Sequence, residues 1–132
     1  MKLNQPIGKL EYAAIFVRIP LGLYFIMAGL LKLNDVNVFI EVVKSYQILS
    51  GNAATLAGIL IPYLEIGIGG LMILGLWTTL AGIVAGAMLT SFIYAVGISV
   101  EELFNKDFIL LGAAISLLFS GPGAFSIDGI KK

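Results

Sequence analysis

Three ionisable side chains lie within the long apolar stretches of this sequence, and they are the residues best suited to chemistry. Arg18 and Lys32 belong to the first apolar stretch, and Glu65 lies inside the apolar run 59–76. Ionisable side chains are costly in the hydrocarbon of a membrane, and they occur there mainly in pairs or at functional sites. These three residues are therefore the first candidates for a binding or proton-transfer site.

The composition indicates an integral membrane protein. Of the 132 residues, 59% are hydrophobic and only 12% are charged, and the mean hydropathy is +1.02. Ordinary globular domains carry about 25% charged residues. A spanning helix needs about 20 apolar residues, so a chain of this length holds at most about four spans. We predict a single domain that covers residues 1–132.

The missing residue types exclude several kinds of chemistry. The chain has no cysteine and no histidine, so it offers neither thiolate nor imidazole to a metal ion or a haem. Its formal net charge is zero, which leaves no basic surface for nucleic acid. We therefore expect no metal site, and any redox chemistry needs a bound cofactor or a partner.

The apolar pattern predicts an all-α fold, an integral membrane four-helix bundle. The spans are expected at residues 12–33, 54–76, 79–100 and 107–120. In segment 36–49, apolar residues recur at helical spacing with polar residues between them, which predicts an amphipathic interfacial helix between helices 1 and 2. Two interpretations of this helix stay open, a plain interfacial anchor and a lid over an entrance from the lipid.

Four spans place both ends of the chain on one side of the membrane. The lysines at the two ends slightly outnumber those of the opposite connections, which are Lys32, Lys44 and Lys106. The positive-inside rule then predicts cytoplasmic termini. The first apolar stretch is about 20 residues long with no small-residue cleavage site after it, so it is expected to stay as the first helix. We expect a multi-pass protein of the cell inner (cytoplasmic) membrane.

The helical faces suggest how the charged residues meet. At about 100° per residue, Arg18 and Lys32 share a glycine-containing face of the first helix, and Glu65 shares such a face of the second. Antiparallel packing brings Arg18 and Glu65 to similar depths, so we predict an ion pair between them and expect Lys32 to snorkel to the interface. That pair either only joins two helices or forms part of a site, to which Tyr24, Tyr63 and Tyr94 can add hydroxyl groups.

Several motifs together resemble those of the DoxX and MauE families of small four-helix membrane proteins. They follow the family order along almost the whole chain, as Arg18-Ile-Pro-Leu-Gly22, Ala28-Gly-Leu-Leu-Lys32-Leu33, Tyr46-Gln-Ile-Leu49, Pro62-Tyr-Leu-Glu65-Ile-Gly67, and Ser120-Gly-Pro-Gly123 with Ser126-Ile-Asp128. Members of these families are associated with redox processes and often act beside a catalytic partner.

The resemblance implies a redox-associated subunit that interacts with a quinone, with membrane lipids, and with protein partner subunits or further copies of itself. In this resemblance Arg18, Lys32, Glu65 and Asp128 correspond to the family's polar positions. With Tyr24 and Tyr63 added for their hydroxyl groups, Arg18, Lys32 and Glu65 are the candidate quinone or lipid site; no catalytic residue is assigned. Many MauE members carry cysteines before the last helix, whereas region 101–107 here has none. Direct disulfide transfer by this chain is therefore excluded.

Three functions stay open on the sequence. A redox-associated subunit that binds a quinone head group predicts a cavity beside Arg18 and Glu65 that opens to lipid. A non-catalytic structural or assembly subunit of a larger membrane complex predicts tight pairing and no cavity. A small transporter or proton channel is supported by Glu65 alone and needs a path for water.

Overall fold

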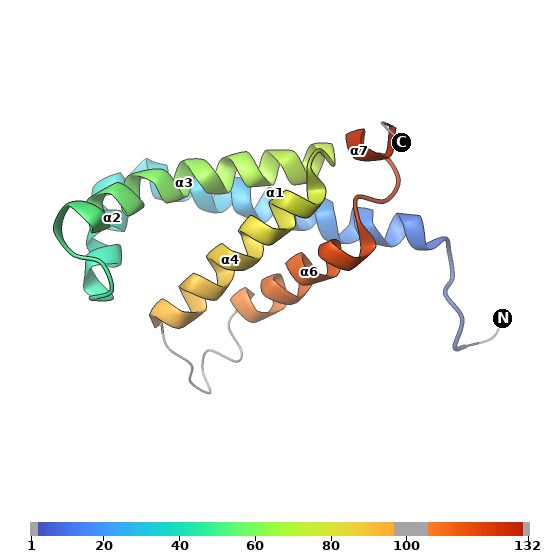
Figure 1. Ribbon diagram of the computed structural model, residues 1–132, viewed down its shortest axis with the longest axis horizontal. Helices are drawn as coiled ribbons and strands as arrows, with labels where there is room; N and C mark the ends of the chain where they lie inside the picture. The colour runs from blue at the N-terminus through green and yellow to red at the C-terminus, as the bar shows by residue number, and fades with distance from the viewer. Residues whose placement is uncertain (1–2, 97–105, 131–132) are drawn as a thin grey trace.

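The chain folds into helices joined by short connections (Figure 1). The computed structural model describes residues 3–96 and 106–130. The helices in these ranges are α1 (Leu10–Asn34), α2 (Val36–Ser45), α3 (Gly51–Leu74), α4 (Thr78–Val96), α6 (Lys106–Ser120) and α7 (Ile127–Ile130). The all-α prediction is confirmed. The predicted end of the third span and most of the polar loop after it lie outside the described residues.

Length and composition identify three membrane-spanning candidates in the described part of the chain: α1, α3, and residues Thr78–Ala95 of α4. The structure is thus that of a multi-pass membrane protein. The predicted fourth helix, 107–120, corresponds to α6, which has 15 residues. At 1.5 Å per residue α6 is about 22 Å long, less than the roughly 30 Å of the hydrocarbon core.

Two helix ends differ from the prediction because the backbone turns left-handed there. The second span was expected to reach residue 76, but α3 ends at Leu74, where Gly75 has a φ of 68°. The N–H of Leu76 then donates to the carbonyl of Leu71 at 3.0 Å, which closes a Schellman turn. The amphipathic helix ends at Ser45 rather than 49, shortly before Gln47, whose φ is 59°.

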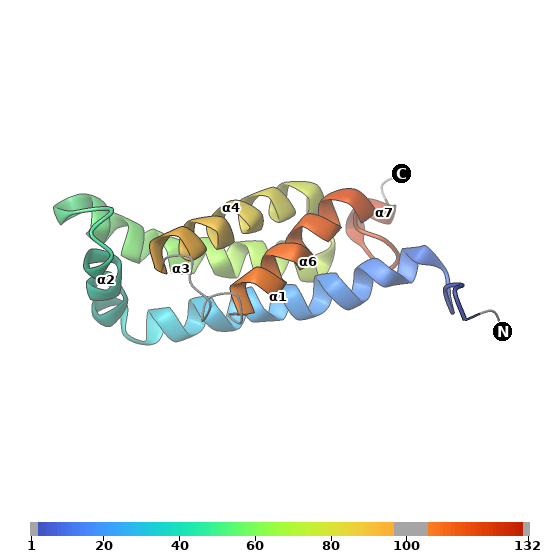
Figure 2. The same ribbon diagram turned by 90° about the horizontal axis from the view of Figure 1, so that it is seen from below.

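The helices form two antiparallel pairs. Helices α1 and α3 lie side by side along the length of the molecule, and the shorter helices α4 and α6 pack against them at a slant (Figures 1 and 2). Helix α2 lies at one end, where it connects α1 to α3. Helix α7 lies at the opposite end, near the start of α1 (Figure 2). The molecule therefore has an α2 end and an α7 end.

Glycines bring the backbones of α1 and α3 into close contact. A Cβ atom on Gly22 would lie 2.8 Å from the carbonyl oxygen of Gly69, and one on Gly29 would lie 2.6 Å from that of Pro62. Side chains would not fit at either crossing point, as is common where membrane helices approach closely. These contacts fix the register, because residue 22 lies level with residue 69 and residue 29 with residue 62.

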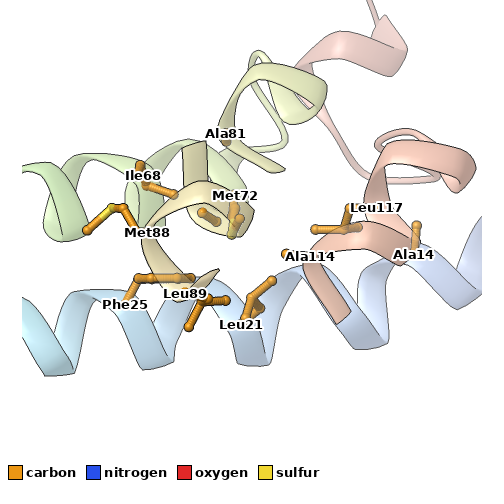
Figure 3. Packing of buried hydrophobic residues seen from close by; sticks show 11 residues of the cluster. Ala14, Leu21, Phe25, Ile68, Met72, Ala81, Met88, Leu89, Ala114 and Leu117 are labelled. Carbon is orange, nitrogen blue, oxygen red and sulfur yellow. The ribbon is translucent and has the colours of Figure 1, made fainter. Parts of the chain in front are cut away.

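The core lies between the two helix pairs. Its side chains are apolar and come from all four long helices, and the buried cluster includes Leu21, Phe25, Ile68, Met72, Leu89, Ala114 and Leu117 (Figure 3). Interior packing of this kind holds helices together in a membrane, where exclusion from water contributes little to association. The core separates two groups of charged residues, one near each end of the bundle.

Candidate functional site

Lys32 and Glu65 form an ion pair toward the α2 end of the bundle. Lys32 Nζ lies 2.5 Å from Glu65 Oε1, and the two side chains are 25% and 1% exposed. Each residue comes from a helix that can span a membrane. A pair of opposite charges is the usual way in which a membrane protein retains an ionisable residue at such depth.

The direction of helical side chains explains why these two residues meet. By register Lys32 lies level with residue 59, six residues or about 9 Å from Glu65. Side chains on a helix lean toward its N-terminus. Since α1 and α3 are antiparallel, the lysine leans back along α1 while the glutamate leans toward the start of α3. The two side chains therefore approach each other and close the gap.

Two aromatic rings enclose the ammonium group of Lys32. Its Nζ atom lies 5.0 Å from the ring centroid of Phe39 on α2 and 4.9 Å from that of Phe92 on α4. Both distances are within the range of cation–π attraction. An ammonium has three N–H donors, and among the described residues its hydrogen-bond acceptor is Glu65. Lys32 thus joins α1, α2, α3 and α4 at one point.

A cleft opens beside this ion pair. It has a volume of about 420 Å³, and its walls come from α1, α2, α3, α4, the start of α6 and the connection after α2. We call it the main cleft. Tyr24, Lys32, Phe39 and Phe92 line it among mostly apolar side chains, whereas the buried Glu65 does not. A cleft of this size and character is typical of small-molecule sites.

Arg18 lies in a different environment, near the α7 end. The side chain is fully buried and donates to four backbone carbonyl oxygens. One guanidinium nitrogen reaches Met72 at 3.2 Å and Ile73 at 3.3 Å, and the other reaches Ala124 at 3.2 Å and Phe125 at 3.0 Å. The first two carbonyls end α3, where the helix dipole is negative. Arg18 therefore ties α1 to the end of α3 and to the segment before α7.

Asp128 completes this arrangement at the α7 end. Its carboxylate accepts hydrogen bonds from the backbone N–H groups of Trp77 at 3.0 Å and Thr78 at 2.9 Å. Its own N–H donates to the carbonyl of Gly75 at 2.9 Å. A carboxylate at a helix N-terminus satisfies free N–H groups and complements the positive end of the dipole. Asp128 thus caps α4.

The predicted ion pair between Arg18 and Glu65 is wrong. The glycine contacts place Arg18 level with Ile73, eight residues from Glu65, which is about 12 Å along the helix. The two side chains also lean away from each other, because each leans toward the start of its own helix and Arg18 already lies beyond Glu65 in that direction. For the same reason Lys32 does not snorkel outward but reaches inward to Glu65.

The other predicted site residues divide between the main cleft and the outer surface. Tyr24 lines the main cleft, and its ring packs edge-on against Phe25 with centroids 5.7 Å apart. Tyr63 and Tyr94 are exposed on the outside of the bundle and do not line that cleft. The structure therefore brings together Lys32, Glu65 and Tyr24, and it leaves Arg18 and Tyr63 apart from them.

The sequence prediction missed the role of the two phenylalanines. Phe39 was expected only as part of an amphipathic helix, and Phe92 was not singled out. A lysine at the end of a spanning helix, followed by an aromatic residue seven positions later, was the available signal for Phe39. No local pattern points to Phe92, because its contact with Lys32 depends on how α4 packs.

Fold and site together define a small multi-pass membrane protein with a buried ion pair beside an apolar cleft. The sequence model of the family described as "Methylamine utilisation protein MauE" matches residues 10–107, and the chain belongs to this family. The MauE part of the predicted resemblance is thereby confirmed, and membership fits an accessory role in a redox system. No curated protein and no solved structure matches the chain.

Proposed function

We propose that this protein is a redox-associated accessory subunit that binds the head group of a quinone in the main cleft and works beside a catalytic partner. The observation that carries the proposal is the position of Lys32. Its ammonium lines a mostly apolar cleft with aromatic side chains, and its charge is balanced by the buried Glu65. The other charged residues in the lining, Lys106 and Asp107, are of opposite sign. A neutral ligand with hydrogen-bond acceptors suits such a site.

The chemistry of the main cleft matches that of a quinone ring. A quinone has two carbonyl oxygens, which accept hydrogen bonds, and a flat ring that packs well against aromatic side chains. Lys32 has N–H donors beyond the one given to Glu65, and the Tyr24 hydroxyl adds another donor to the same cleft. Phe39 and Phe92 provide ring faces on α2 and α4.

The partner supplies the redox centre. The chain has no cysteine and no histidine, so it supplies no thiol and no imidazole ligand, and in this proposal the metal, flavin or thiol centre belongs to the partner. The family is described by its part in methylamine utilisation, which supports action beside other proteins. We place the protein in the cell inner membrane with its α7 end cytoplasmic, so that the main cleft lies toward the opposite side.

Binding of a decyl-substituted benzoquinone to the purified protein in lipid nanodiscs tests the proposal. We expect Lys32→Met to weaken binding at least about tenfold, the equivalent of one charge-assisted hydrogen bond. The matched control is Lys44→Met, because Lys44 lies on α2 and pairs with Glu41 at the surface. The double variant Lys32→Met with Glu65→Gln should also fail to bind while keeping the site uncharged. Equal binding by all four proteins would refute the proposal.

A second candidate function is that of an assembly subunit. Cβ atoms added at Gly67 and Gly70 on α3, or at Gly112 on α6, would meet nothing within 4 Å. Glycines that are not used inside the bundle leave room for a helix from another subunit. This candidate predicts stoichiometric partner subunits after gentle purification, no bound quinone, and loss of the partners in a Gly67→Leu variant.

A further inference from the structure

A second hollow adjoins the main cleft on the outer side of α1. It has a volume of about 530 Å³, and the lining residues that belong to it alone are Met27, Ala28 and Leu31 of α1, Asp35 between α1 and α2, and Val38 of α2. We call it the side groove. The two hollows share lining residues, namely Tyr24, Lys32, Phe39, Val42 and Lys106. The two hollows are therefore neighbours, and Lys32 and Phe39 lie where they meet.

The side groove faces the lipid. Met27 and Leu31 are 54% and 70% exposed although they are large and apolar. Both lie in the last third of α1, a helix long and apolar enough to span a membrane. Outward apolar side chains at such a position contact acyl chains. The groove thus leads from the polar junction at Lys32 to the hydrocarbon.

The arrangement along α1 gives the groove its shape. Tyr24, Ala28 and Leu31 are spaced so that they lie on one face of the helix. Ala28, between two large side chains, leaves a depression that a longer residue would fill. Phe39 and Val38 of α2 bound it on the other side. This gives a groove that is apolar along Met27, Ala28, Leu31 and Val38 and has polar side chains at Lys32, Asp35 and Lys106. Such a groove suits a head group followed by a chain.

We propose that the side groove holds the hydrocarbon chain of the ligand whose head group occupies the main cleft. The ligand class is accordingly a long-chain quinone that enters from the lipid between α1 and α2, rather than a small quinone that enters from water. This inference rests on the proposed function, since the head-group site defines the polar end of the groove.

The free energy of moving the hydrocarbon chain from lipid into the side groove should be small. A chain gains little by leaving lipid for an equally apolar groove, because acyl chains are as apolar as leucine side chains. Chain length alone should therefore change the Kd only modestly. The position of the chain is the sharper observable, so the test maps it directly.

The probe is a benzoquinone whose decyl chain carries a diazirine at its middle, bound to the protein in phosphatidylcholine nanodiscs and then irradiated. We expect mass spectrometry to locate adducts at Met27, Leu31 or Val38. Excess long-chain quinone without a diazirine should suppress these adducts. Ala28→Phe should lose most of the label, whereas the matched control Ala87→Phe, at an exposed position on α4, should keep it. Met27→Trp provides a second blocking variant at an exposed site.

The outcomes separate this inference from the proposed function. If a chainless benzoquinone binds the wild type but the label lies on other helices, the groove assignment is wrong and the head-group site stands. Adducts at Met27, Leu31 or Val38 that excess long-chain quinone does not suppress would also overturn the inference, because the groove would then be open to any membrane lipid. If neither quinone binds, the proposed function fails together with it.

Discussion

The charge of Lys32 is balanced inside the protein, and this determines what its site can hold. Glu65 takes one N–H donor and cancels the charge, while Phe39 and Phe92 cover two sides of the ammonium. Removing two charges from water is costly unless each is well paired. The other charged residues that line the main cleft, Lys106 and Asp107, are of opposite sign. The remaining donor capacity of Lys32 therefore favours a neutral acceptor ligand over an anion.

Removing one partner of this pair should destabilise the protein. Lys32→Met leaves the buried Glu65 carboxylate without its partner, and breaking a buried pair costs about 3–5 kcal/mol. We expect a value near the lower limit, since Lys32 is 25% exposed. The double variant with Glu65→Gln removes both charges and should recover most of that stability. Thermal unfolding in detergent measures both, and a single variant as stable as wild type would contradict the pairing.

Arg18 should affect stability without affecting the ligand. The guanidinium donates to two pairs of carbonyls in different directions, and a lysine ammonium, a compact group with three donors, has no such fork. Arg18→Lys should therefore lose about 2–3 kcal/mol, the equivalent of one or two charge-assisted hydrogen bonds. Quinone affinity should stay unchanged, because Arg18 does not line the main cleft. Weaker binding at full stability would show that Arg18 acts on the site. Lys9→Met, at an exposed position, is the control.

At the scale of helices, the contact between α1 and α3 positions Arg18, Lys32 and Glu65 relative to one another. A Cβ on Gly22 meets a backbone oxygen of α3 at 2.8 Å, whereas one on Gly67 meets nothing within 4 Å. Gly22→Ala should therefore cost about 1–3 kcal/mol through overpacking. Gly67→Ala should be neutral or stabilising by up to about 1 kcal/mol, because alanine favours a helix.

Thermal unfolding of the two alanine variants and the wild type measures these changes in stability. If both variants lose the same amount of stability, replacing any glycine has this effect, and the close contact at Gly22 does not explain it. A loss at Gly22 should also weaken quinone binding, since a shift of α1 against α3 separates Lys32 from Glu65. A loss of stability in Gly67→Ala alone would instead indicate that Gly67 contacts a helix of another subunit.

The helices could be predicted from the sequence, whereas the pairing of charged residues could not. Apolar runs and turn residues located α1, α3 and α6 to within a few residues, because hydrophobicity and length are local properties. The partner of Glu65 depended on register and on side-chain direction. The register was accessible in principle, since Gly22 and Gly29 are seven residues apart and face Gly69 and Pro62 at the same spacing. The main cleft depended on the packing of α2 and α4, which no local pattern encodes.

At the scale of the whole molecule, orientation in the membrane determines which side the main cleft faces. The chain contains no cysteine, so single cysteines can be introduced without background. With cytoplasmic termini, Ser45→Cys at the end of α2 should react with an impermeant maleimide in intact cells. Asn4→Cys, before α1, should react only after permeabilisation. The reverse pattern would place the main cleft on the cytoplasmic side.

The contacts of Arg18 also have a consequence for biosynthesis. Two of its acceptors, Met72 and Ile73, enter the membrane with α3, but the other two, Ala124 and Phe125, are translated only after α4 and α6. Until then the nascent chain holds a guanidinium in the bilayer with half of its carbonyl partners. The segment that contains Ala124 and Phe125 therefore completes the hydrogen bonding of a charged residue in the first helix.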